Sequence, residues 1–246
     1  MQRLWPDPGP VDDVDALVAA EVRPARPDRP WLLVNMVASL DGAIAVDGRS
    51  GSLGGPADKA MFAALRGIAD VILVGAGTVR AEGYGPPRPS EAVRAARRAR
   101  GQAEVPRLAV VSRSLDLDPT APCFAEANAP PCVVTCGAAP ADRRSDLAAV
   151  ATVVAVGDVE VDLAAALARL AADGAGVVLC EGGPSLNGDL AAAGLIDEWD
   201  LTVSPLLVGG TSARAVHGPA LPDPSRFALD RLLEADGLLL GRWIAL

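Results

Sequence analysis

The chain has 246 residues, half of them hydrophobic, and a formal net charge of -9. This size and composition predict a globular protein with a large core and exclude a disordered one. The acidic balance argues against nucleic acid or an anionic membrane as the main partner, and no apolar run is long enough to cross a bilayer. Residues 1–10 lack the apolar stretch of a secretory signal, so we expect a cytoplasmic protein.

The first 30 residues are rich in proline and aspartate, and we expect them to form an arm on a single domain that occupies residues 31–246. Within this arm, residues 11–22 show a weak apolar face that is compatible with a short helix. The prolines at positions 24, 27 and 30 then prevent the helix from continuing.

Short apolar runs alternate with helical patterns from residue 31 onward. Strands are predicted at 31–37, 71–74, 108–111, 132–135, 152–156 and 177–180. Helices are predicted at 57–69, 91–100, 161–173 and 185–193. This alternation is typical of an α/β sheet with helices on both faces. Two further strand-like runs, 198–208 and 238–246, have no strong helix between them, so we expect an antiparallel pair at the sheet edge.

Glycines directly follow two of the predicted buried strands. Gly75 and Gly77 follow the strand 71–74, where their amides and the start of a helix can bind an anion. This is half of a dinucleotide fingerprint, and alone it is equally compatible with a tight turn. Glu181, Gly182 and Gly183 follow the strand 177–180 and precede a helix. Two such exits from one sheet favour a single extended, phosphorylated ligand.

Ser112 and Arg113 follow the strand 108–111, where an enzyme using NAD would carry an acidic residue for the ribose hydroxyl. A hydroxyl and an arginine suit a 2′-phosphate instead, which indicates NADPH, although a surface turn is a common alternative. The four cysteines contain no C-x-x-C pair, so we expect free thiols and no metal site. His217 lacks the H-x-E context that a zinc deaminase needs.

Four ordered blocks resemble one family. They are residues 35–42 (NMVASLDG), 48–56, 71–85 (VILVGAGTVRAEGYG) and 178–210. Together they are similar to the reductase domain of bacterial riboflavin-biosynthesis deaminase-reductases, a domain with a fold like that of dihydrofolate reductase. The resemblance implies an α/β fold with an eight-stranded mixed central sheet, helices on both faces, a C-terminal antiparallel hairpin and a homodimer. It is weakest over residues 86–105, 115–131 and 211–236.

The resemblance also implies where ligands bind. NADPH would be held by residues of both glycine-containing turns, namely Gly75, Gly77, Thr78, Val79, Gly182, Gly183, Pro184, Ser185 and Leu186. Ser112 and Arg113 would take its 2′-phosphate. The substrate would be lined by Asn35, Ser50, Arg66, Glu82 and Glu181. From the residues themselves, rather than from the resemblance, we expect Arg66 or Arg88 to hold the substrate phosphate, although the helix dipole also explains a cation at position 66.

The implied reaction is the NADPH-dependent reduction of 5-amino-6-(5-phosphoribosylamino)uracil to its ribitylamino form. Hydride would go to C1 of the opened ribose, with Glu82 or Glu181 as the catalytic carboxylate that moves the proton. The chain departs from the family at Asn35 and at Glu82. These departures keep open a same-fold reductase of another substrate, such as dihydrofolate, and a non-catalytic NADPH-binding module. The incomplete fingerprint disfavours a Rossmann dehydrogenase.

Overall fold

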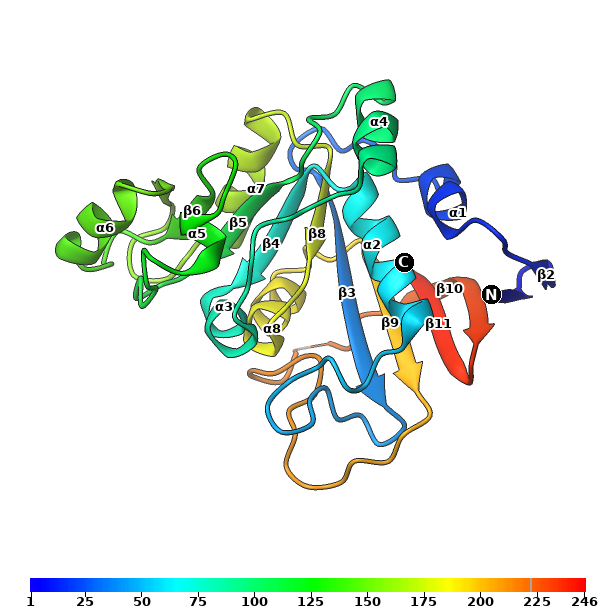
Figure 1. Ribbon diagram of the computed structural model, residues 1–246. Coiled ribbons are helices and arrows are strands. Elements are labelled where there is room, and N and C mark those ends of the chain that lie inside the picture. The colour runs from blue at the N-terminus through cyan, green and yellow to red at the C-terminus, as the bar shows by residue number, and fades with distance from the viewer. Residues whose placement is uncertain (222) are drawn as a thin grey trace. The chain divides into compact units, whose positions relative to one another are not determined.

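The computed structural model describes residues 1–221 and 223–246 (Figure 1). The strands of these residues are β1 (Gln2–Trp5), β2 (Gly9–Pro10), β3 (Trp31–Ser39), β4 (Val71–Gly75), β5 (Arg107–Val111), β6 (Cys132–Thr135), β7 (Thr152–Ala155), β8 (Val177–Cys180), β9 (Glu198–Ser204), β10 (Phe227–Ala235) and β11 (Leu238–Ala245). The helices are α1 (Val14–Ala20), α2 (Pro56–Ile68), α3 (Ala76–Glu82), α4 (Glu91–Ala99), α5 (Pro122–Ala125), α6 (Ala141–Ala148), α7 (Leu163–Ala172) and α8 (Pro184–Ala192).

The strands follow the order β2-β1-β10-β11-β9-β3-β8-β4-β5-β6-β7. The predicted mixed α/β sheet with a C-terminal antiparallel hairpin is therefore confirmed. The eight strands that the family resemblance implied were too few, because the described residues form eleven. By their contacts these residues form two compact units, of which unit 1 comprises 1–24, 31–68 and 179–246, and unit 2 comprises 25–30 and 69–178.

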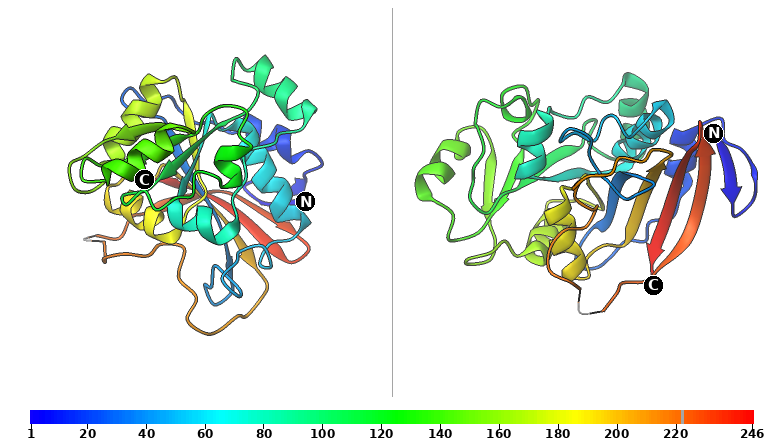
Figure 2. Two further views of the ribbon diagram at one scale, coloured as in Figure 1. Left: turned by 60° about the vertical axis from the view of Figure 1, so that its left-hand side comes forward. Right: turned by 90° about the horizontal axis from the view of Figure 1, so that it is seen from below.

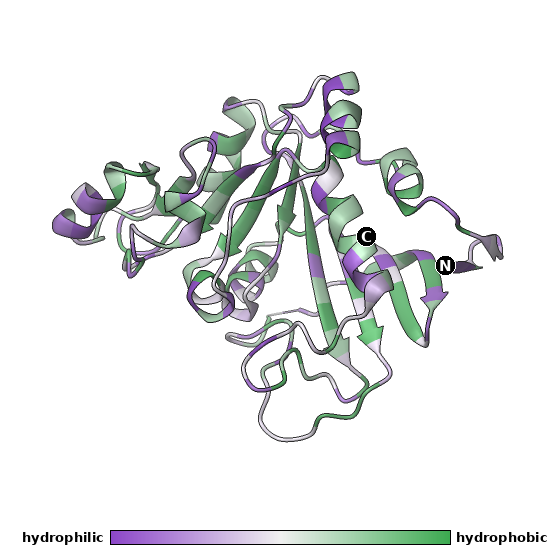
Figure 3. Cartoon of the chain, viewed as in Figure 1, coloured by the Kyte–Doolittle hydropathy of each residue, from purple (hydrophilic) through white to green (hydrophobic). Residues whose placement is uncertain are grey.

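Unit 2 is built on short parallel strands whose central residues are apolar. β4 pairs with β5, β5 with β6, and β6 with β7, all in parallel. The side chains of Ile72, Leu108 and Val133 belong to one buried cluster. Strands buried on both faces need no polar alternation, which explains the continuous apolar runs in the sequence. The strands are mostly hydrophobic in Figure 3, whereas α4 carries hydrophilic residues.

Unit 1 contains the antiparallel part of the sheet. β9 pairs in parallel with β3 on one side and antiparallel with β11 on the other. β11 then pairs with β10, β10 with β1, and β1 with β2. The predicted pair of 198–208 and 238–246 is confirmed, but its place at the sheet edge was wrong. The N-terminal strands lie beyond β10, beside the hairpin (Figure 2).

Helices cover both faces of β3 within unit 1. On one face, Arg231 donates a hydrogen bond to the sulfur of Met61 in α2 and another to Asp200. Asp200 is in turn paired in register with Asn35 of β3. On the other face, a Cβ added to Gly182, just before α8, would lie 3.3 Å from the Met36 sulfur. Successive residues of a strand point to opposite faces. Asn35 therefore faces α2, and Met36 faces the start of α8.

In β9 polar and apolar residues alternate in the reverse of the usual sense: the polar residues are buried and the apolar residues are half-exposed. Glu198 is fully buried and accepts hydrogen bonds from Arg23, Trp31 and Arg242 at 2.7–3.1 Å. Burial alone would raise the pKa of Glu198, but the hydrogen bond from Arg242 and the charge of Arg23 lower it to about 2. Buried carboxylates persist only when paired in this way.

A second buried carboxylate extends this charge cluster. Arg231 lies between Asp200, at 3.1 Å, and Glu21 of the N-terminal segment, at 2.6 Å. Burial and the neighbouring charge of Glu198 raise the pKa of Asp200 well above its usual range. Glu21 and Arg23 thus integrate the N-terminal segment into unit 1. The predicted division of the chain at residue 30 stays a prediction.

Candidate active site

In unit 2, β4 leads directly into α3, and Gly75 is the N-cap of that helix. The N-cap makes no side-chain hydrogen bond to the first turn. The first amides of a helix need an outside partner, and a phosphate is a suitable one. Gly77 adds to this fit, because a Cβ built on it would meet nothing within 4 Å. The start of α3 therefore suits the approach of a ligand phosphate to the backbone.

The next residues of α3 differ in what they can offer. Thr78 is half-buried, whereas Val79 is 4% exposed and packs in the core of unit 2. Val79 can therefore contact a ligand only through its backbone. Glu82 is the last residue of α3 and is exposed, at the opposite end of the helix from Gly75.

The other predicted ligand residues of unit 2 lie on loops. Ser112 is buried directly after β5, and its amide donates to the Val134 carbonyl at 2.9 Å. Arg113 is exposed and forms an ion pair with Glu160. Arg88 is also exposed and pairs with Glu126. Exposed pairs of this kind contribute little stability, so either arginine can exchange its carboxylate for a phosphate.

In unit 1, β8 leads through Glu181, Gly182 and Gly183 into α8. Gly183 is the N-cap, again without a side-chain hydrogen bond, and Pro184 occupies the first turn. Gly182 has φ +81°, which favours glycine, and the peptide bond between the two glycines is cis. Ser185 is exposed, and Leu186 is buried. This helix start, like that of α3, presents a backbone suited to an anionic group.

Glu181 and Arg66 form the best-defined side-chain pair of the candidate site. Arg66 Nε donates to Glu181 Oε1 and Arg66 Nη2 to Glu181 Oε2, both at 2.7 Å. The Glu181 side chain is only 5% exposed. Arg66 also lies over the Phe62 ring, 4.2 Å from its centroid. The last turn of α2 thus brings Arg66 to the exit of β8, so two predicted site residues from distant parts of the sequence meet.

The face of β3 that carries Asn35 has polar neighbours that sequence reasoning missed. Asn35 is half-buried and pairs in register with Asp200, and Val37 pairs with Thr202. Thr202 is hydrogen-bonded to Asp58 of α2, and burial raises the pKa of Asp58. Residues 198–204 do alternate between polar and apolar, but this pattern alone is typical of a strand whose polar side faces solvent. Ser50 lies in the loop before α2, where its carbonyl accepts from the Leu53 amide at 3.0 Å.

The four cysteines are free and buried, as predicted. Within residues 1–221 and 223–246, no three His, Cys, Asp or Glu side chains are grouped so as to hold a metal. No helix in the described part of the chain is both long and apolar enough to cross a membrane.

These features define a mixed α/β protein in which glycine-capped helices and an Arg–Glu pair follow the strand ends. Residues 30–237 match the model of the RibD C-terminal domain family, and the chain belongs to this family. The predicted resemblance is therefore confirmed.

Individual relatives agree with this assignment. The 2,5-diamino-6-ribosylamino-4(3H)-pyrimidinone 5′-phosphate reductase of Methanothermobacter thermautotrophicus is 34% identical over 190 residues, which cover 76% of this chain and 83% of that protein. The riboflavin biosynthesis protein RibD of Bacillus amyloliquefaciens is 28% identical over 75% of this chain and 48% of its own length. The crystal structure of a pyrimidine reductase-like protein from Corynebacterium diphtheriae is 26% identical, with a TM-score of 0.83 over 95% of this chain and 98% of that one.

Proposed function

We propose that this chain uses NADPH to reduce 5-amino-6-(5-phosphoribosylamino)uracil to its ribitylamino form, a step of riboflavin biosynthesis. The observation that carries the proposal is the family match over residues 30–237, which includes both glycine-containing strand exits and the Arg66–Glu181 pair. The identity of 34% to a reductase that acts on a ribosylamino-pyrimidine phosphate supports the same reaction.

The proposed cofactor residues are those of the two helix starts. Backbone amides of Gly75, Gly77, Thr78 and Val79, and of the segment 182–186, would hold the phosphates and ribose of NADPH. Ser112 and Arg113 would bind the 2′-phosphate, for which Arg113 would leave Glu160. When bound, NADPH supplies the hydride that reduces C1 of the opened ribose.

The protein's own contribution to the reaction would be positioning and proton movement. Both oxygens of Glu181 already accept from Arg66, which fixes this carboxylate and suits it to bind ribose hydroxyls. Glu82 is exposed and would move the proton of ring opening. Arg88, which pairs with the exposed carboxylate of Glu126, suits the substrate phosphate better than Arg66, while Asn35 and Ser50 would contact the rest of the substrate.

A second candidate substrate is favoured by the curated relative from Methanothermobacter thermautotrophicus. Its name specifies the 2,5-diamino-pyrimidinone, which carries an amino group where the uracil carries an oxygen. The two compounds share the ribosylamino phosphate that the proposed reaction changes. The same residues would therefore act on either one.

The test is to give the purified chain NADPH with each of the two pyrimidine phosphates. We expect NADPH oxidation and a product heavier by two hydrogen atoms. Glu82→Gln should lower kcat by at least about tenfold while the dissociation constant of NADPH stays unchanged. Turnover of dihydrofolate alone, or binding of NADPH without oxidation by either pyrimidine, would reject the proposal.

We also propose that the protein acts as a homodimer through the apolar outer face of unit 1. On this face Trp199 is paired with Trp243, and Val203 with Leu239, across β9 and β11. Leu239 is 38% exposed, as is Leu229 of β10, which is paired with Trp243. A row of aromatic and aliphatic side chains on an outer sheet face is typical of an interface between protein copies.

A further inference from the structure

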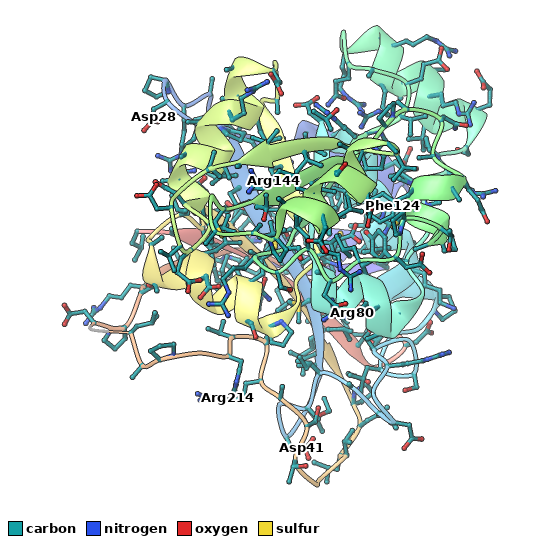
Figure 4. All side chains as sticks on the ribbon, turned by 90° about the vertical axis from the view of Figure 1, so that its left-hand side faces the viewer. Asp28, Asp41, Arg80, Phe124, Arg144 and Arg214 are labelled. Atoms are coloured by element: carbon teal, nitrogen blue, oxygen red, sulfur yellow. The ribbon has the colours of Figure 1, made fainter. Side chains whose placement is uncertain are left out.

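Two segments of unit 1 are tied together by hydrogen bonds, and of their residues only Ser50 has a part in the proposed reaction so far. One is the β3 loop, residues 40–55, and the other is the β9 strap, residues 205–218. Asp41 of the loop accepts from the amides of Val208, at 3.2 Å, and Gly209, at 2.6 Å. Figure 4 shows Asp41 where these two segments meet. A turn-forming Asp-Gly pair in the sequence therefore also holds a distant part of the chain.

Further contacts reinforce this tie on both sides of Asp41. Ser39 Oγ donates to Asp41 Oδ1 at 2.5 Å, and the Leu40 amide donates to the Leu206 carbonyl at 2.9 Å. Ser212 of the β9 strap accepts from the amides of Ile44 and Ala45, each at 3.2 Å. Charge-assisted bonds such as those to Asp41 are stronger than neutral ones. Asp41 and Ser212 thus fix the first turn of the β3 loop at two points.

The far end of the β9 strap lies on α8. The Asn187 side-chain amide donates to the Ala215 carbonyl at 2.8 Å, and the His217 amide donates to the Pro184 carbonyl at 3.0 Å. A Cβ added to Gly188 would lie 2.2 Å from the His217 carbonyl oxygen. The strap therefore packs against the first turns of this helix so closely that only glycine fits there.

We propose that Asp41 is a positioning residue that couples the two ligands of the enzyme. Through the β9 strap it links the β3 loop, which carries Ser50, to the start of α8. Ordering of α8 by the cofactor then orders the β3 loop for the substrate. This inference rests on the proposed function, in which α8 contacts the cofactor and Ser50 the substrate.

The physical basis is a continuous series of hydrogen bonds and close contacts from α8 through the β9 strap to the β3 loop. A bound phosphate at α8 would restrain Pro184 and Asn187, which hold the strap, and Asp41 and Ser212 pass that restraint to the β3 loop. Coupling between two binding sites is reciprocal. The substrate must therefore tighten NADPH binding by the same factor by which NADPH tightens substrate binding.

The first measurement is amide hydrogen exchange with and without NADPH, in the wild type and in Asp41→Asn. In the wild type, NADPH should slow exchange in α8, in the β9 strap and at residues 40–46. In Asp41→Asn it should still slow exchange in α8 but no longer at residues 40–46. Asp47→Asn is the matched control, because Asp47 is an exposed carboxylate of the same loop at φ 50°, a conformation that asparagine tolerates.

The second measurement separates KM from cofactor binding. Asp41→Asn should raise KM for the pyrimidine phosphate by about tenfold, corresponding to the loss of one to two hydrogen bonds, with the dissociation constant of NADPH changed less than about twofold. Ser212→Ala removes the second tie and should act in the same direction with a smaller effect. If Asp41→Asn does not fold, Ser212→Ala tests the coupling in its place.

Three outcomes are informative. Wild-type protection at residues 40–46 and a wild-type KM in both variants would overturn the coupling. A change in NADPH affinity alone would also overturn it, because the β3 loop would then have no part in the effect. A wild type that binds NADPH but reduces neither pyrimidine rejects the proposed function, while the exchange measurement still decides whether Asp41 couples α8 to the β3 loop.

Discussion

Arg66 and Glu181 are joined by two parallel hydrogen bonds of 2.7 Å, although 115 positions separate them in the chain. Arg66 lies in the last turn of α2, and Glu181 directly follows β8. The pair therefore fixes the end of a helix to the end of a strand. Its planar, two-point geometry is available to arginine but not to lysine. The pair is thus both a structural tie and the rigid part of the proposed substrate site.

Removal of the arginine should destabilise the protein, because Glu181 would remain nearly buried without the two hydrogen bonds from Arg66. For Arg66→Met we expect a loss of about 2–4 kcal/mol in the free energy of unfolding. Urea denaturation measures this loss. Arg98→Met, which removes the exposed pairs of Arg98 with Glu91 and Glu104, should cost less than about 1 kcal/mol. Equal losses in the two variants would contradict the assignment.

A methyl group at position 77 should interfere with the cofactor and not with the fold. Gly77→Ala meets no protein atom within 4 Å and gains helix propensity of up to about 1 kcal/mol. We expect an unchanged or higher Tm together with a rise of about tenfold in the Kd of NADPH. Gly9→Ala, which also meets open space, should change neither quantity. If Gly77→Ala binds NADPH with the wild-type Kd, no phosphate of the cofactor lies against residue 77.

Arg113 should determine the preference for NADPH over NADH. Arg113→Ala removes the charge proposed to bind the 2′-phosphate, so the ratio of kcat/KM for the two cofactors should fall by about tenfold or more. The kcat/KM for NADH should hardly change. Arg143→Ala, another exposed arginine of unit 2, serves as the control. A preference that survives Arg113→Ala would remove this residue from the cofactor site.

Asp41 should contribute to stability at neutral pH and lose its effect in acid. The hydrogen bond from Ser39, followed by those from the Gly209 and Val208 amides, lowers the pKa of Asp41 from 3.8 to about 2. A depressed pKa in the folded state stabilises it above the unfolded pKa, and this contribution disappears as the pH falls through the folded pKa.

The corresponding measurement is the difference in unfolding free energy between the wild type and Asp41→Asn as a function of pH. It should be constant above about pH 4 and decline between about pH 4 and 2. Glu198 has a pKa of about 2 and titrates in the same window, but it does so in both proteins and cancels in the difference. A difference that is independent of pH would show that the carboxylate charge is not what holds the β9 strap.

A charge on the outer face of unit 1 should separate the proposed dimer. Leu239→Glu places a carboxylate among Val203 and the neighbouring apolar side chains, and sedimentation should then show a monomer. Leu207→Glu changes a leucine that is 80% exposed outside this face and should leave the assembly intact. A wild-type chain that sediments as a monomer would refute the proposal directly.

Much of the parallel sheet could be predicted because its signal is local. The runs 71–74 and 177–180 are apolar throughout, and the glycines directly after them mark the strand exits. The antiparallel part was harder. Residues 227–235 (FALDRLLEA) suit an amphipathic helix as well as a strand, and pairing with β11 and β1 decides the matter. Sequence periodicity does not carry such long-range information.

The candidate site shows the same division. Glu181 and the glycines were predictable from their positions after a buried strand. The partners of Asn35 were not, because Asp200 lies in an alternating pattern that indicates exposure of its polar side. Its burial depends on Arg231 and Glu21, which are distant in sequence. The role of Asp41 was hidden for a similar reason, since an Asp-Gly pair is sufficient by itself to explain a turn.

The charge cluster around Glu198 means that the bounds of the family match and the bounds of the folded protein differ. The family match begins at residue 30 and ends at residue 237, yet Glu21 and Arg23 lie before it, and β11 lies after it. A fragment trimmed to the match would open a gap between β9 and β10 and expose charges that need their counterparts. Fusions and truncations should therefore retain both ends of the chain.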